Sequence, residues 1–288
     1  MPNTDTPFPR NTDTAARRAA LRLPRTARLA LAASVAVTLA GCGTAAGSDD
    51  RGGTFFGPSH DLGRGTSKTY VNLDTDGNPT EVGLRISESA LDGLPSGPDA
   101  RPQMLMLDLP DEASDTVFES VMLDWNPNGH EPQILWGKPH FDMHFYLTDM
   151  AEVHAIDPAD PDFAAKAARL PDPKYIPRDY VTPPGPPAAN AVPAMGLHWN
   201  DATDGLIPGS FDFTEVLLNG SWDGQFTFIE PMMTREWLLT RPTLREDLKL
   251  PQAYPKSGYS PTTYNVRFDD EAGEYVVALG GLTMREQS

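Results

Sequence analysis

Segments of alternating apolar and polar residues, separated by short turn sequences, constrain the fold of this chain more than any other feature. A period of two places successive side chains on opposite faces of a β-strand. Pairs of such segments flank turn-forming residues within 68–87, 211–231 and 263–282, and further β-rich segments fill 118–147. The chain is therefore predicted to be mainly β, an antiparallel β-sandwich or barrel with a few short helices.

Helices are expected to be few, because the runs with helix-forming residues are brief. They are predicted at 87–95, 148–156, 162–170 and 232–240. The apolar stretch 132–136 is predicted to be a strand that pairs with its neighbours on both sides. The stretch 171–193 contains too many prolines for regular structure and is predicted to cross the surface as an extended excursion.

The first 41 residues are typical of an export signal rather than of a folded domain. Several arginines precede the apolar run LALAASVAVTLAG, which is short for a permanent membrane helix. The run ends in Leu39-Ala40-Gly41-Cys42, which resembles the lipobox of bacterial lipoproteins, and Cys42 is the only cysteine of the chain. A plain secretory cleavage beside an unmodified cysteine is the alternative.

These features divide the chain into three predicted parts. Residues 1–41 form a lipoprotein signal peptide, 42–66 a flexible tether rich in Gly, Ser and Asp, and 67–288 a single β-rich globular domain. A lipid on Cys42 would hold that domain at the extracytoplasmic face of the cell envelope. Contact with the membrane is then expected through the lipid.

The acidic composition excludes one class of partner. The whole chain has 23 Lys and Arg against 40 Asp and Glu, and residues 1–41 hold six of the basic and two of the acidic side chains, so 17 and 38 remain after cleavage. The resulting formal net charge of −21 repels nucleic acid and anionic lipid headgroups, but it attracts cations. Nucleic-acid binding is not expected, and whether the chain forms homo-oligomers stays open.

The segment PHFDMHFYL at 139–147 contains two histidines four positions apart with an aspartate between them. Its strict alternation predicts a strand with one face buried in the core and the other carrying His140, Asp142 and His144. On a strand, residues four apart have Cβ atoms about 13 Å apart, so His140 and His144 cannot bind one ion unless a bulge bends the strand. Residues two apart can bind the same ion, so the possible chelating pairs are His140 with Asp142 and Asp142 with His144. The zinc-protease pattern H-E-x-x-H needs a helix and is rejected here.

Further metal-binding residue types occur in other apolar or aromatic segments. With those of the strand they form the predicted site, which consists of His140, Asp142, His144 and His198, with His130 and Glu230 as additional candidates. Imidazole and carboxylate ligands without thiolate favour zinc, iron or copper. A polar pocket without metal, in which the same side chains hydrogen-bond to one another, accounts for the pattern equally well, and unrelated surface positions are a third alternative.

The motifs GHEP, PHFDMHFY and MGLHW resemble, in combination, a family of uncharacterised bacterial extracytoplasmic proteins, many of them lipoproteins. The likeness extends over most of residues 67–286. It implies an envelope location and one β-rich unit, and it assigns no role to the histidines. The chain has Met143 where an aromatic residue is expected, and this position should affect only packing.

The leading hypothesis is a lipid-anchored, extracytoplasmic binding module with a histidine-lined pocket for a ligand or metal. A structural or assembly protein of the envelope, without metal, is the second hypothesis. A metal-dependent hydrolase or oxygenase is the third, and it would require an open coordination position and a general base. No nucleophile elbow, phosphate-binding loop or dinucleotide fingerprint occurs in the sequence, so the question of enzymatic activity stays open.

Overall fold

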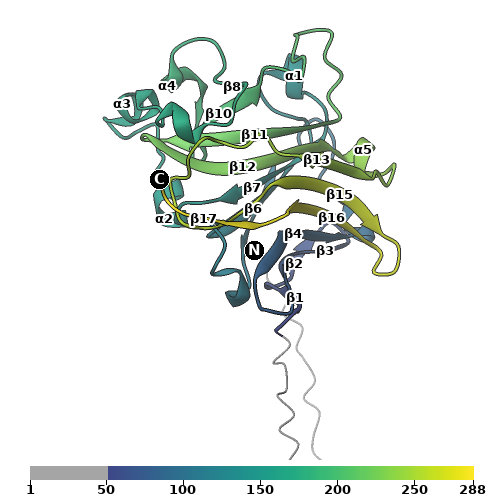
Figure 1. Cartoon of the computed structure of the whole chain (residues 1–288). Helices are drawn as coiled ribbons and strands as arrows, with labels where there is room; N and C mark the ends of the chain where they lie inside the picture. Colours follow the sequence, from purple (N-terminus) through teal and green to yellow (C-terminus); the bar gives the residue numbers. More distant parts are fainter. Residues whose placement is uncertain (1–50) are drawn as a thin grey trace, which may run out of the picture. The chain divides into compact units, whose positions relative to one another are not determined.

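Two antiparallel β-sheets lie face to face in the part of the chain that the computed structural model describes, residues 51–288 (Figure 1). A seven-stranded sheet has the order β1-β3-β4-β16-β15-β13, with β2 paired to β3. Its strands are β1 (Gly53–Phe56), β2 (His60–Leu62), β3 (Gly65–Leu73), β4 (Pro79–Ser87), β13 (Leu244–Asp247), β15 (Thr263–Asp269) and β16 (Glu274–Gly280).

An eight-stranded sheet has the order β5-β6-β7-β12-β11-β10-β8, with β9 paired to β10, again within the described residues. Its strands are β5 (Gln103–Asp108), β6 (Ser120–Asn126), β7 (His140–Tyr146), β8 (Tyr180–Val181), β9 (Ala191–Val192), β10 (Gly196–Asp201), β11 (Glu215–Trp222) and β12 (Gln225–Thr234). A small separate ladder pairs β14 (Gly258–Ser260) with β17 (Thr283–Arg285). The prediction of a mainly β, sandwich-like fold is confirmed.

The helices between residues 51 and 288 are short. They are α1 (Gln133–Trp136), α2 (Met150–His154), α3 (Phe163–Ala168), α4 (Pro187–Asn190) and α5 (Arg235–Leu238), with 3-10 turns η1 (Glu88–Leu91), η2 (Asp111–Ala113) and η3 (Pro173–Tyr175). In this part of the chain, no helix is long and apolar enough to cross a lipid bilayer. Figure 1 shows α1, α3 and α4 beyond β11 and β12, on the side away from β15 and β16.

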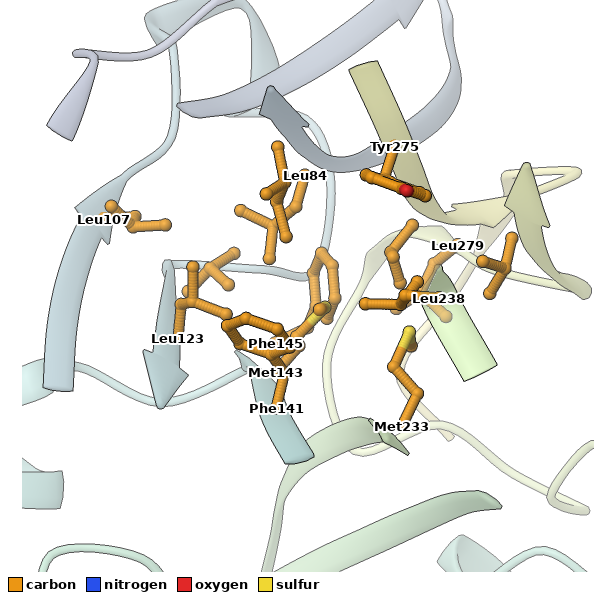
Figure 2. Close-up of a cluster of buried hydrophobic side chains, with 14 of the residues drawn as sticks. Leu84, Leu107, Leu123, Phe141, Met143, Phe145, Met233, Leu238, Tyr275 and Leu279 are labelled. Carbon is orange, nitrogen blue, oxygen red and sulfur yellow. The ribbon is translucent and has the colours of Figure 1, made fainter. Parts of the chain in front are cut away.

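The main core lies between the two sheets. Strand β7 contributes Phe141, Met143 and Phe145, which meet Leu84 of β4 and Leu279 of β16 (Figure 2). All five side chains are fully buried. Met143 therefore lies on the core face, as its position in the alternating pattern predicts. Since one face of β7 is committed to this core, its polar residues project from the opposite face of the sheet.

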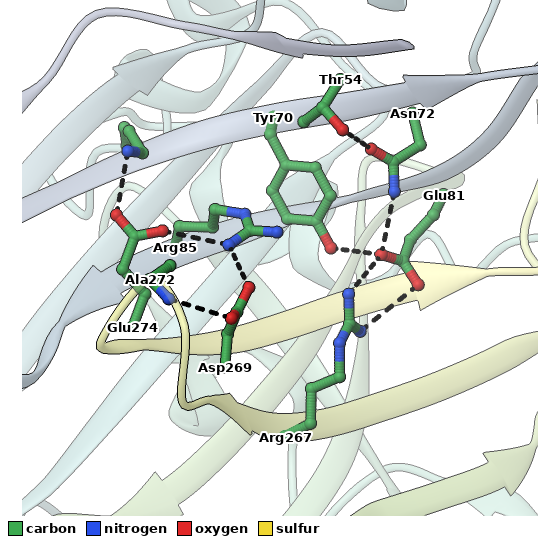
Figure 3. Close-up of polar contacts among 10 residues, drawn as sticks. Thr54, Tyr70, Asn72, Glu81, Arg85, Arg267, Asp269, Ala272 and Glu274 are labelled. Carbon is green, nitrogen blue, oxygen red and sulfur yellow. Dashed lines mark hydrogen bonds and ion pairs between the residues drawn. The ribbon is translucent and has the colours of Figure 1, made fainter. Parts of the chain in front are cut away.

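The outer face of the seven-stranded sheet is covered by paired charges. Arg85 bonds to Asp269 and Glu274, and Arg267 bonds to Glu81, at 2.9, 3.1 and 3.0 Å (Figure 3). These side chains are partly exposed, and each carboxylate has a guanidinium partner. The charges of these three carboxylates are therefore balanced by side chains of the same sheet.

Three of the predicted hairpins are present: β3 with β4, β11 with β12, and β15 with β16. The Asp223-Gly224 turn has both residues at positive φ, +51° and +80°, as a tight hairpin turn requires. The predicted strand at 132–136 is wrong, because this segment is helix α1. A short apolar run fits either structure, and the helical turn directs Trp136 onto Phe213, with ring centroids 5.0 Å apart.

Two further boundaries need correction. The predicted helix at 232–240 begins only at Arg235, because Met232 and Met233 extend β12 and the Thr234 side chain caps α5. Strands β1 and β2 lie within 42–66, the predicted tether, so the folded part begins before residue 67. Strand β1 pairs with β3 through its backbone, which a Gly-rich sequence does not prevent. The signal peptide, the lipobox and Cys42 lie outside the described residues.

Candidate metal centres

Acidic and imidazole side chains collect on the outer face of the eight-stranded sheet, opposite the core. Strand register places Asp124 of β6 beside Asp142 of β7, and Asn126 beside His140. Strand β12 adds Glu230, and His198 comes from β10. Every residue of β7 is buried, so the face that carries His140, Asp142 and His144 is covered as well as the core face. Apolar side chains from α1, α2 and their loops pack over the polar face at both ends.

The Asp142 triad consists of His130, His140 and Asp142. His140 Nε2 lies 3.0 Å from Asp142 Oδ1, and His130 Nε2 lies 3.3 Å from Asp142 Oδ2. His140 and Asp142 are neighbours on one face of β7, whereas His130 belongs to the loop between β6 and α1. The two residues from the strand are buried, and the His130 side chain is 38% exposed.

Backbone carbonyls orient both imidazoles of this triad. His140 Nδ1 lies 2.6 Å from the carbonyl oxygen of Lys138, and His130 Nδ1 lies 2.9 Å from that of Glu131. A carbonyl oxygen only accepts hydrogen bonds, so each Nδ1 carries the proton and donates it. In the neutral imidazole, each Nε2 then has a free lone pair directed at Asp142. This is the arrangement of metal-binding histidines in proteins.

The Glu230 triad consists of His144, His198 and Glu230. His144 Nε2 lies 3.2 Å from Glu230 Oε1, and His198 Nε2 lies 3.3 Å from Glu230 Oε2. Glu230 and His144 are almost completely buried, and the His198 side chain is 16% exposed. Three different strands, β7, β12 and β10, therefore contribute one ligand each.

Gly220 makes the Glu230 triad possible. It pairs with both Phe228 of β12 and His198 of β10, so it lies between them in the sheet. A Cβ atom at position 220 would lie 2.0 Å from the Phe228 ring. With no side chain there, the ring lies over β11 and packs against His198, with centroids 5.0 Å apart. Phe228 also packs against His144, at 4.8 Å, and so supports both imidazoles.

The buried polar atoms of both triads are close together but are not hydrogen-bonded to each other. His140 Nε2, Asp142 Oδ1, His144 Nε2 and Glu230 Oε2 have no hydrogen-bond partner within residues 51–288. Leaving a buried polar group unpaired costs about 1–3 kcal/mol, so such atoms require an explanation. Around a tetrahedral ion with bonds of 2.0–2.1 Å, neighbouring ligand atoms lie about 3.4 Å apart. The nitrogen–oxygen separations of 3.0 to 3.3 Å lie near that value, with the two nitrogens of each triad facing different oxygens of one carboxylate.

The charges also favour a cation. Burial raises the pKa of Asp124 to about 8, and burial together with Asp142 and Asp124 raises the pKa of Glu230 well above its ordinary value. Burial lowers the pKa of His144 to about 3 and that of His198 to about 4, so both imidazoles are neutral at pH 7. Neutral imidazole is the form that binds metal, whereas the acids lack a positive partner.

The pKa of Asp142 responds to two opposing effects. Burial alone would raise it, but the adjacent His130 and His140 lower it below its ordinary value. Asp142 in turn raises the pKa of His130, against the effect of burial. Asp142 is therefore an ionised carboxylate next to two imidazoles, which is a ready-made ligand for a divalent cation.

The six residues predicted from sequence all lie in this polar layer, but in two groups of three rather than in one pocket. His140 and His144 belong to different triads, as their spacing on an extended strand requires. Sequence reasoning missed Asp124 and Asn126, although the pattern of β6 at 120–126 alternates in the same way. Asn126 Nδ2 donates to Asp142 Oδ2 at 2.7 Å, and Asp124 Oδ2 lies 3.8 Å from His144 Nδ1.

Residues 74–125 match a family model described as TTHB210-like, hypothetical protein TTHB210. The match extends from the β3–β4 turn to β6 and contains none of the six triad residues. It agrees with a resemblance to an uncharacterised family, over a shorter range than the 67–286 expected. No similarity was found to a curated protein or to a solved structure. The case for a metal site therefore depends on the geometry of this chain.

Proposed function

We propose that this protein is a metal-binding module in which each triad holds one divalent transition metal ion. The observation that carries the proposal is the convergence of buried, unpaired nitrogen and oxygen atoms at the separations of a metal coordination sphere. Two imidazoles and one carboxylate are the donor set of many zinc and non-haem iron sites. Zinc, iron or copper are the metals of choice, because each triad offers nitrogen as well as oxygen donors.

Metal analysis of the purified full chain tests this proposal. After chelation and reloading with Zn²⁺, we expect two equivalents in the wild type and one in either Glu230→Gln or Asp142→Asn. Both replacements keep the shape of the side chain and remove its charge. Glu81→Gln on the other sheet is the matched control and should retain two equivalents. Absence of bound metal, or two equivalents in all three variants, would contradict the proposal.

We also propose that the module is anchored by a lipid at Cys42 on the extracytoplasmic face of the envelope. The support is the sequence Leu39-Ala40-Gly41-Cys42 at the end of an apolar export signal. Expression in a bacterial host with a labelled fatty acid should label the wild type and not Cys42→Ser. A Cys42→Ser protein that still carries the label would contradict lipidation at this residue.

A further inference from the structure

The two triads differ in how many ligand atoms their carboxylate offers. We propose that a metal ion in the Asp142 triad keeps one coordination position accessible from solvent and binds a small anionic ligand there, whereas an ion in the Glu230 triad is enclosed by its own side chains. This inference rests on the proposed function, because it concerns the same two sites. It assigns exchange of an external ligand to one triad and a structural role to the other.

Both oxygens of Glu230 face an imidazole. Oε1 lies 3.2 Å from His144 Nε2, and Oε2 lies 3.3 Å from His198 Nε2. Oε2 is buried and has no hydrogen-bond partner within residues 51–288. Glu230 can therefore bind through both oxygens, and with the two imidazole nitrogens it supplies four donor atoms. Four donors complete a closed site for zinc.

Both oxygens of Asp142 also face an imidazole, but Asn126 already donates a hydrogen bond to one of them. Asn126 Nδ2 donates to Asp142 Oδ2 at 2.7 Å, a short contact between two buried side chains. Oδ1 has no hydrogen-bond partner in the described part of the chain and lies 3.0 Å from His140 Nε2. Oδ2 lies 3.3 Å from His130 Nε2 but already accepts the Asn126 hydrogen bond, so Oδ1 and two imidazole nitrogens are the three free donor atoms of the Asp142 triad. Three protein ligands and one exchangeable ligand are typical of reactive zinc sites.

Solvent reaches the Asp142 triad through His130. The His130 side chain is 38% exposed and lies in a loop, whereas the more exposed imidazole of the Glu230 triad, His198, is 16% exposed. A divalent ion bound by one carboxylate keeps a net positive charge, so the ligand that completes its coordination should be negatively charged or become so on binding. Hydroxide, azide and small carboxylates belong to this class.

Cobalt substitution with azide as the probe tests the inference. Co²⁺ reports changes of its coordination in the visible spectrum, and the cobalt content of each sample is measured alongside. We expect azide to change the spectrum of the wild type and of Glu230→Gln, in which only the Asp142 triad is loaded. Asp142→Asn, with only the Glu230 triad loaded, should be unresponsive to azide although it contains cobalt.

The outcomes separate the two proposals. A wild type that binds no cobalt would overturn the proposed function together with the inference. Bound cobalt without an azide response in the wild type and in Glu230→Gln would overturn the inference alone. An azide response in Asp142→Asn equal to that of the wild type would overturn it too, because the enclosed triad would then be the one that exchanges ligands.

Asn126→Ala tests the physical reason for the difference. Without Asn126, both oxygens of Asp142 are free to bind the ion, and we expect azide to bind at least about tenfold more weakly, in line with the usual effect of removing a residue that orients a metal ligand. Asn219→Ala is the matched control, since Asn219 is a buried asparagine of the same sheet outside both triads. Equal azide affinity in Asn126→Ala and Asn219→Ala would contradict this role of Asn126.

Discussion

The outer faces of the two sheets place acidic side chains in opposite electrostatic environments. On the seven-stranded sheet, Glu81, Asp269 and Glu274 each bond to an arginine or a lysine (Figure 3). On the eight-stranded sheet, Asp142 and Glu230 are more deeply buried, and within residues 51–288 their ion-pair partners are histidines only. One face is balanced by the chain itself, and the other is short of positive charge.

This difference favours the outer face of the eight-stranded sheet as the face that binds a cation from solution. A buried carboxylate without a cation costs several kcal/mol, so a face that only stabilises the fold is expected to pair its charges. The paired face follows that expectation. The triads do not, although the same strands could carry lysine or arginine. A bound cation removes the conflict, and His144 and His198, which burial keeps neutral, are in the form that binds a metal ion.

Among the tests of this comparison, the largest expected effect is the stabilisation of the folded protein by bound metal. At a Zn²⁺ concentration 1,000-fold above the Kd, one site stabilises the folded state by about 4 kcal/mol. For a domain of this size, we expect the Tm measured by calorimetry to rise over that of the chelated protein by roughly 8–16 °C for each triad that is loaded. Mg²⁺, which prefers oxygen ligands in an octahedron, is the control and should have little effect. A rise that persists in Asp142→Asn combined with Glu230→Gln would contradict the triads as its source.

The second-largest expected effect comes from replacing one glycine in each sheet by alanine and comparing stability and metal binding. A Cβ at Gly220 would lie 2.0 Å from Phe228, and a Cβ at Gly83 would lie 2.9 Å from Tyr70 and closer still to backbone. We expect either replacement by alanine to lower the free energy of unfolding by about 2–3 kcal/mol, as overpacking does. Only Gly220→Ala should also weaken metal binding at the Glu230 triad, by about 10–100-fold.

Denaturant titration and zinc affinity measure the two quantities separately. Adding Phe228→Leu to Gly220→Ala removes the clash and should restore part of the stability. Metal binding that is equally weakened by Gly83→Ala would mean that the triads respond to general destabilisation rather than to the position of Phe228 and His198.

The sequence predicts most of the fold because strand alternation and turn chemistry are local. Segments such as 68–87 and 263–282 carry both signals, and the corresponding hairpins are present. The predictions of secondary structure that are wrong concern segments whose structure depends on tertiary contacts. Residues 132–136 are apolar enough for a strand, but Trp136 packs on Phe213 only if the segment turns as a helix. Strand β1 depends on the edge that β3 offers, which its own sequence does not reveal.

The candidate site is predictable in its residue types and not in its grouping. Alternation shows that His140 and Asp142 share a face, and it shows that His144 is too far from His140 to share an ion. It does not show that β12 lies beside β7, which brings Glu230 to His144. His198 lies near Glu230 because β10, β11 and β12 are neighbours in the sheet, which the sequence does not reveal. Sheet order is a long-range property, so one pocket was expected where two triads exist.

A smaller effect compares one carboxylate from each face in the metal-free protein. Glu81→Gln breaks the bond to Arg267 and should lower the free energy of unfolding by about 1–2 kcal/mol. Glu230→Gln replaces a buried acid whose pKa is well above its ordinary value because of burial, so it should leave stability unchanged or raise it by about 1 kcal/mol. Urea unfolding in the presence of a chelator measures both. Equal losses in the two variants would show that Glu230 has a positive partner within the protein.

The smallest effect is a difference in pH dependence between acids of the two sheets. Glu215 of β11 forms no ion pair within residues 51–288, and burial raises its pKa to about 8. Its unfolded pKa is about 4.3, so its contribution to stability is complete below that pH and is lost as the pH rises towards 8. Asp269 has the opposite sign, because its bond to Arg85 lowers its pKa, and its contribution is lost only in acid.

Between pH 6 and pH 8, the metal-free wild type should therefore lose about 1 kcal/mol per pH unit more than Glu215→Gln does. Asp269→Asn should differ from the wild type by the same amount at both pH values. Urea unfolding at the two pH values measures these differences, and the titration of the histidines cancels because all three proteins share them. If the wild type and Glu215→Gln change equally, Glu215 is ionised throughout, and a shortage of positive charge does not extend across the eight-stranded sheet beyond the triads.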